Sequence, residues 1–187
     1  MGSEMCIRDS ISCTTIVCIY FFFSIEECTQ GPLHGLSGDE WAKSTDIQDP
    51  DQRCTAEIIK TVVKYDEVVD SIQTTYRLRD GDDYVIYDAP MMGGPYGKHE
   101  DVITLEDGER IIAVSGQLDD SWIGSTAAVI NQLTFLISKS NGDVRISGPY
   151  GSATSGDKFA IGGNIRSFYG TYGPEYLRGL GAFLKLC

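Results

Sequence analysis

The sequence predicts an all-β domain in which three similar β units surround an approximate three-fold axis. Short runs of β-branched and aromatic residues recur along the body of the chain and are separated by Gly, Asp and Asn. A Gly-Pro loop occurs three times, and three turn-strand segments can be laid over one another without gaps. A sandwich or a barrel would satisfy the strand pattern alone. A plain sandwich does not predict the triplication, so a three-fold arrangement is favoured.

Residues 1–30 are predicted to form a leader, and residues 31–187 to form the domain. The apolar run at 11–25 is shorter than the roughly 20 residues of a membrane-spanning helix, and it suits the apolar region of a signal peptide. Glu4 and Asp9 accompany a single Arg8 before it, and no small-residue cleavage site follows, so a non-native segment is the alternative. A secreted or extracellular location is therefore the expectation.

Of the six cysteines, Cys6, Cys13 and Cys18 lie within or before the apolar run at 11–25, which leaves Cys28, Cys54 and Cys187. They show no C-x-x-C spacing, and the chain has only two histidines, so a structural zinc site is not expected. One disulfide among the three is compatible with an oxidising compartment, and lone buried cysteines are the alternative. The sequence does not determine which pair would form.

The strand pattern begins at residue 56. Around 71–78, Ile72, Thr74, Tyr76 and Leu78 alternate with polar residues, which is typical of a half-buried strand. The stretch 57–69 also fits helical spacing, but its β-branched content favours a strand. Strands are expected in the runs 56–63, 84–87, 101–105, 109–114, 127–137, 143–147, 164–169 and 177–186.

The repeated segments indicate the fold more specifically than the strand pattern does. The Gly-Pro loops are GPLHGLSGDEW at 31–41, GGPYGKHED at 93–101 and GPYGSATSGDKF at 148–159. The turn-strand segments are DEVVDSIQTTY at 66–76, AAVINQLTFLI at 127–137 and PEYLRGLGAFL at 174–184. Each loop is expected to pair with one turn-strand unit.

These segments, in this order, resemble the jacalin-related lectins. The resemblance covers 31–187 and includes VVDSIQTTY, GGPYG followed by VITLEDGERIIAVSG, and YLRGLGAFL. It implies a β-prism I fold, with three four-stranded antiparallel sheets in pseudo-three-fold symmetry. It also implies a non-enzymatic, carbohydrate-binding lectin that needs no metal or other cofactor and favours mannose- or glucose-type glycans.

The charge of the chain restricts its partners. With 27 acidic and 15 basic residues the formal net charge is −12, which repels nucleic acid and anionic lipid alike. Glycans or glycoproteins are the expected partners, with no membrane insertion. A homodimer would strengthen weak single sites through multivalency.

In the resembling family, sugar lies between a Gly-rich loop and a turn of pattern G-x-x-x-D. A carboxylate accepts sugar hydroxyl hydrogens, while backbone N–H groups of the turn donate to sugar oxygens. We call each pair of a turn and its facing Gly-rich loop a slot. The first slot retains the carboxylate as Asp70, with Asp66 where glycine is usual. Its predicted residues are Asp66, Glu67, Val68 and Asp70, facing Gly93 and Gly94.

The last repeat gives a second candidate slot, formed by Gly35, Gly38, Glu175, Tyr176 and Arg178. Here Arg178 stands at the carboxylate position, and a guanidinium donates hydrogen bonds but cannot accept them. The slot is therefore either lost or converted to recognise an acidic sugar. The middle repeat has Asn131 at this position and is expected to be structural.

Other features favour ordinary structural roles. The acidic runs 80–83 and 119–120 are interpreted as solvated turns rather than calcium sites. His34 and His99 either line a pocket or are isolated surface histidines. Trp41 and Trp122 either stack on a sugar or pack beneath their own loops. Because Asp66, Asn131 and Arg178 depart from the family pattern, a structural or protein-interaction prism without sugar binding is the alternative function.

Overall fold

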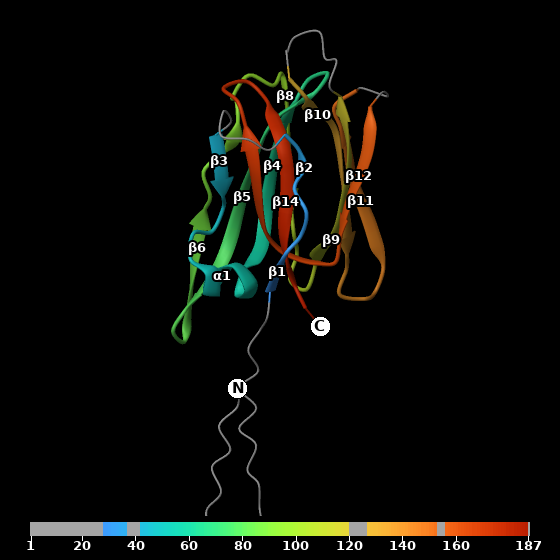
Figure 1. The fold of residues 1–187 in the computed structure, drawn as a ribbon. Coiled ribbons are helices and arrows are strands. Elements are labelled where there is room, and N and C mark those ends of the chain that lie inside the picture. Colours follow the sequence, from blue (N-terminus) through green and yellow to red (C-terminus); the bar gives the residue numbers. More distant parts are fainter. Residues whose placement is uncertain (1–27, 37–41, 120–126, 153–155, 187) are drawn as a thin grey trace, which may run out of the picture.

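Three antiparallel β-sheets enclose a shared apolar core in the computed structural model (Figure 1), which describes residues 28–36, 42–119, 127–152 and 156–186. Sheet A has the strand order β1-β14-β13-β3, sheet B has β6-β5-β4-β8, and sheet C has β11-β10-β9-β12. Short strands β2 and β7 add to β14 and β5 respectively. The architecture is β-prism I, as the resemblance implied.

The elements have the following bounds: β1 Cys28–Gln30, β2 His34–Gly35, β3 Ala42–Thr45, α1 Pro50–Thr55, β4 Glu57–Tyr65, β5 Val69–Asp80, β6 Asp83–Asp88, β7 Met92–Gly93, β8 His99–Thr104, β9 Arg110–Asp119, β10 Val129–Ser138, β11 Val144–Tyr150, β12 Asp157–Gly162, β13 Asn164–Tyr172 and β14 Leu177–Lys185.

The long central strands follow the predicted pattern, and the differences lie in short elements. Strand β1 falls within the range assigned to the leader, yet it pairs with β14 and is part of sheet A. Strand β12 has only Phe159 and Ile161 as buried apolar residues, too few for a clear period-two signal. Each missed strand is defined by its pairing with a longer neighbour.

Helix α1 was also not predicted. Its start is specified locally, because the Asp49 carboxylate accepts from the backbone N–H of Asp51 at 3.0 Å and Pro50 occupies the first turn. It is a single short helix without buried residues, so it has no apolar stripe to reveal it. No helix within the described ranges combines the length and apolar character needed to cross a membrane.

The three sheets are equivalent in the strand that follows each binding-type turn. Strands β5, β10 and β14 each begin within one of the three aligned turn-strand segments, and each lies in the interior of its sheet. Their inward residues meet in the core, where Phe135 of β10 packs edge-on against Phe168 of β13 at 6.5 Å between ring centroids. The positions of the three turns are therefore fixed by a common core.

A buried polar contact joins sheets A and B within this core. The Tyr76 hydroxyl donates to the Asp46 carboxylate and accepts from the backbone N–H of Phe168 at 3.2 Å. Burial raises the pKa of Asp46 from 3.8 to about 7, although the Tyr76 hydrogen bond opposes this shift. Because the folded state holds this proton more tightly than the unfolded chain, the associated stability is present below pH 3.8 and is lost as the pH rises through about 7.

Substituting Tyr76→Phe tests this contact. The change keeps the ring but leaves the Asp46 carboxyl and the Phe168 N–H buried without the hydroxyl, so we expect a loss of about 2 kcal/mol in the free energy of unfolding. Chemical denaturation monitored by circular dichroism measures it. The matched control is Tyr84→Phe on an exposed strand, expected to change stability by less than about 0.5 kcal/mol. Equal effects of the two substitutions would contradict the role assigned to Tyr76.

Candidate functional site

The same backbone contact recurs in all three sheets at one end of the prism. A glycine with positive φ lies against the backbone carbonyl of the residue at the carboxylate position, so closely that a Cβ on it would come within 2.0–2.2 Å of the carbonyl oxygen. The pairs are Gly93 with Asp70, Gly35 with Arg178, and Gly151 with Asn131. Only glycine permits this approach, so each Gly-rich loop is held over its own turn.

The glycines do not occupy the same place in the repeated loop sequence. Gly93 precedes the first GPYG tetrapeptide, whereas Gly151 is the last residue of the second one. The identical tetrapeptides are therefore not structurally equivalent, although each loop does pair with one turn-strand unit. Backbone contact, rather than sequence identity, defines the equivalence.

In sheet B the slot contains the carboxylate of Asp70. The side chain is only 4% exposed, and its Oδ2 is buried with no hydrogen-bond partner in the described part of the chain. The backbone carbonyl of Asp70 accepts from the N–H of Gly94 at 3.1 Å. Gly97 approaches so closely that a Cβ there would lie 3.1 Å from Oδ2. The loop 93–97 therefore surrounds a carboxylate with unused accepting capacity.

Negative charge is concentrated around Asp70. Burial, together with the charges of Asp66 and Glu175, raises the pKa of Asp70 from 3.8 to about 6, although hydrogen bonds from the backbone of Asp70 and Asp66 oppose this shift. The Asp66 carboxylate forms an ion pair with Lys98. That hydrogen bond and the charge of Asp66 raise the pKa of Lys98. The Lys98 ammonium group therefore lies beside Asp66, the position where glycine is usual in the resembling family.

Sheet A contributes to the edge of the same slot. A Cβ on Gly94 would come within 2.5 Å of the Pro174 carbonyl oxygen and within 2.7 Å of Glu175, so the sheet B loop rests directly on the sheet A turn.

Of the predicted residues in the turn of this slot, Val68 is 2% exposed and packs inward. The backbone carbonyl of Glu67 accepts from the N–H of Ser152 at 3.0 Å. Among the predicted slot residues, Val68 can therefore offer a ligand only its backbone.

The sheet A slot has a different character, because its guanidinium faces the protein. Arg178 is 6% exposed, and its Nη1 donates to the carbonyls of Ala127 at 2.8 Å and Ala128 at 3.1 Å in the sheet C turn. The guanidinium also lies 5.5 Å from the ring centroid of Tyr176. Burial lowers the pKa of Arg178. Gly35 contacts this slot as predicted from the loop position, whereas Gly38 lies outside the described residues.

The sheet C position is closed to solvent. Asn131 is 0% exposed and Ala128 is 5% exposed, which agrees with the structural role expected for the middle repeat. Asp70 is thus the one carboxylate among the three equivalent positions.

The remaining sequence candidates have structural surroundings. His34 stacks on Phe159 at 5.0 Å, and His99 lies 5.4 Å from the ring of Tyr65. Gly81, with φ of 61°, forms the hairpin turn between β5 and β6, as the acidic run 80–83 suggested. Trp41, Trp122 and Asp120 fall outside the described residues. Within the described ranges, no three His, Cys, Asp or Glu residues cluster in a way that could hold a metal ion.

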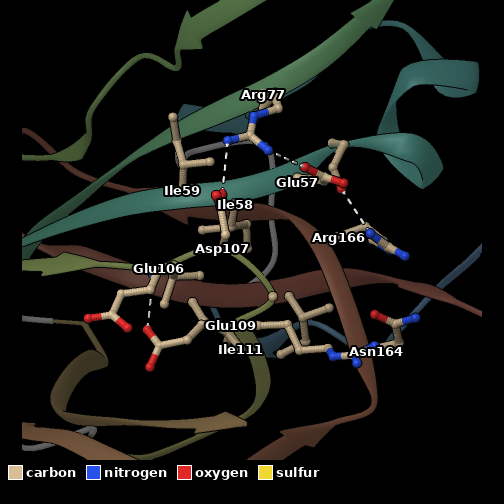
Figure 2. A pocket seen from close by; sticks show the side chains of 15 residues that line it. Glu57, Ile58, Ile59, Arg77, Glu106, Asp107, Glu109, Ile111, Asn164 and Arg166 are labelled. Carbon is tan, nitrogen blue, oxygen red and sulfur yellow. Dashed lines mark hydrogen bonds and ion pairs between the residues drawn. The ribbon is translucent and has the colours of Figure 1, made fainter. Parts of the chain in front are cut away.

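A cavity of about 510 Å³ occurs elsewhere, between the start of β4, the β8–β9 turn and the start of β13. Figure 2 shows the Arg77 guanidinium between the carboxylates of Glu57 and Asp107, at 3.2 and 3.6 Å. The charged groups in this part of the lining already pair with one another. The cavity contains none of the sequence-predicted site residues.

The three-sheet prism and its glycine-held turns define the class of β-prism I domains. The family model of the jacalin-like lectin domain matches residues 30–183, and the chain belongs to this family of non-enzymatic, carbohydrate-binding proteins. No relative is found among curated protein sequences.

Solved structures share the fold at low sequence identity. A mannose-binding jacalin-related lectin from Ananas comosus is 24% identical with a TM-score of 0.66, and the match covers 85% of this chain and 99% of that one. A mannose-specific jacalin-related lectin from Morus nigra, solved with mannose, is 22% identical with a TM-score of 0.65, covering 86% and 96%. Malaysian banana lectin is 21% identical with a TM-score of 0.65, covering 86% and 100%.

Substituting Gly93→Ala tests the backbone contact in the sheet B slot. At φ of 113° the added Cβ would lie 2.0 Å from the Asp70 carbonyl oxygen, so the loop must separate from the turn, and we expect a loss of at least about 3 kcal/mol in the free energy of unfolding. The control is Gly81→Ala, where φ is also positive but no atom lies within 4 Å, so only about 1 kcal/mol of backbone strain is expected. Denaturation curves of both variants measure the difference. A Gly93 variant as stable as the Gly81 variant would show that the contact does not constrain the loop.

Proposed function

We propose that this domain binds neutral mannose- or glucose-type glycans, without a metal ion, through the slot formed by Asp70 and the loop 93–97. The observation that carries the proposal is the Asp70 carboxylate. It is the one carboxylate at the three equivalent positions, and its Oδ2 has no hydrogen-bond partner in the described chain. A buried acceptor without a donor favours a ligand that supplies hydroxyl hydrogens.

The surroundings of Asp70 favour a neutral sugar over an acidic one. Asp66 and Glu175 place negative charge beside the slot, and an anionic ligand would be repelled by all three carboxylates. Lys98 is engaged with Asp66. The two mannose-recognising structures from Ananas comosus and Morus nigra share this fold, which supports a sugar of the same class.

We further propose that the Arg178 slot does not bind sugar. Its guanidinium donates to two carbonyls of the neighbouring turn, so a ligand that recruited it would have to replace both of these hydrogen bonds. Between the alternatives of loss and conversion, these contacts favour loss.

A second candidate function is a protein-interaction prism that does not recognise sugar. Two observations favour it. Asp70 Oδ2 is covered by Gly97, and the Asp66–Lys98 ion pair occupies the side of the slot where the family has glycine. A glycan array on which the chain binds neither neutral nor acidic sugars would support this function.

Calorimetric titration with methyl α-mannoside tests the first proposal. We expect binding by the native chain and a loss of about a hundredfold in affinity for Asp70→Ala, because two charge-assisted hydrogen bonds to sugar hydroxyls are removed. The control is Asp82→Ala in the exposed β5–β6 turn, which removes one negative charge away from the slot and should bind like the native chain. Circular dichroism verifies the fold of each variant. Equal affinities of native and Asp70→Ala proteins would exclude Asp70 from the site.

The affinity should also depend on pH. With the pKa of Asp70 raised to about 6, the carboxylate is about nine-tenths ionised at pH 7 and about one-tenth ionised at pH 5. Since the ionised form accepts the sugar hydroxyls, affinity is expected to fall about tenfold between pH 7 and pH 5. Glu175→Gln removes a charge that raises this pKa, so its midpoint should move to lower pH. An affinity that stays constant over this range would contradict the assignment.

A further inference from the structure

Strand β1 pairs with the edge of β14, and α1, the one helix of the described residues, contacts β14 at the same end of the prism, where Figure 1 shows β1 and α1 side by side. Strand β1 pairs with β14 so that Cys28 is opposite Lys185 and Gln30 is opposite Phe183. Residues two apart in a strand, and residues directly opposite in an antiparallel pair, share one face of the sheet. Cys28 therefore shares a face with Phe183.

Helix α1 covers that face. The Arg53 guanidinium lies 4.9 Å above the centroid of the Phe183 ring. It is held there because its Nε donates to the Ile47 carbonyl at 2.6 Å and its Nη2 donates to the Gln48 carbonyl at 2.7 Å. Cys54 follows Arg53 in the helix, so the strand pairing and the helix position together bring Cys54 to Cys28.

The two thiols are direct neighbours. Both cysteines are free and half-buried, and the Cys54 side chain lies close enough to the Cys28 thiol to affect its protonation. Burial and this contact raise the pKa of Cys28 to about 12, so its thiol keeps its proton at neutral pH. The Cys54 thiol also donates a weak hydrogen bond to the Pro50 carbonyl at 3.9 Å. Two adjacent, partly accessible thiols from different elements meet the first requirement for a disulfide.

We propose that Cys28 and Cys54 form a redox-sensitive dithiol that is oxidised to an intrachain disulfide. With a small disulfide such as glutathione disulfide as the oxidant, the two thiols lose two protons and two electrons, and the Cys28–Cys54 S–S bond forms. The S–S bond of the oxidant breaks, and the same two protons and two electrons convert it into two molecules of glutathione thiol.

The bond would close a loop from 28 to 54, which contains β2 with Gly35 and the edge strand β3. Strand β1 is only three residues long, so few ladder hydrogen bonds hold this segment. A covalent link to α1 restricts the unfolded chain and keeps β1 on sheet A. The inference does not depend on sugar recognition at Asp70.

The test uses the full chain with Cys6, Cys13, Cys18 and Cys187 replaced by Ser, so that Cys28 and Cys54 are the remaining thiols. After incubation with excess glutathione disulfide, we expect loss of both titratable thiols, a proteolytic peptide pair joined between Cys28 and Cys54, and no retained glutathione. The oxidised form should unfold at a temperature several degrees higher than the reduced form.

The further variants Cys28→Ser and Cys54→Ser in this background are the controls. Each should keep one thiol, form only a mixed disulfide with glutathione, and show no such rise in the unfolding temperature. The native six-cysteine chain, oxidised in the same way and digested, should give the same linked peptides. Two thiols that remain titratable in the folded protein, or glutathione retained on both cysteines, would overturn the proposal.

Discussion

The close approach of a glycine to a backbone carbonyl is the constraint on which the candidate site depends. With φ of 113°, Gly93 lies where any side chain would collide with the Asp70 carbonyl, and the N–H of Gly94 donates to that same oxygen. The loop 93–97 is thereby held over the turn 66–70 by contacts between main-chain atoms. The aspartate side chain takes no part in holding the loop, so it is left for another role.

This contact occurs in all three sheets, and it supports the fold through backbone atoms, independently of the side chain at each turn. Because the contact uses only glycine and a carbonyl, the side chain at the turn can vary without loss of the prism. Asn131 is buried in the core, Arg178 links its own turn to the carbonyls of the sheet C turn, and Asp70 keeps an acceptor without a donor. One backbone arrangement thus supports two structural positions and one candidate binding position.

Periodicity and repetition in the sequence predicted the long strands and the three turn-strand segments. The short elements and the side-chain contacts could not be predicted, because they depend on the tertiary fold. The long strands were found because apolar side chains alternate over their length, as around Tyr76, and the three aligned turn-strand segments do begin equivalent strands. Helix α1 and β1 were missed because they are too short to show a period. The repeated GPYG tetrapeptide does not mark equivalent positions, since Gly93 precedes the first copy and Gly151 ends the second. Neither the inward direction of Arg178 nor the proximity of Cys28 to Cys54 is visible in residue spacing.

A two-dimensional ¹⁵N NMR titration of the native chain with methyl α-mannoside tests the central claim most directly, because it observes all three slots in one experiment. The account predicts saturable shifts of the amide signals of Asp70, Gly93 and Gly94, with unchanged signals for Leu36 in the sheet A slot and Asn131 in the sheet C slot. Shifts confined to Leu36 or Asn131, or no saturable shift at any slot, would contradict the claim that the glycine-held carboxylate of sheet B is the sugar site.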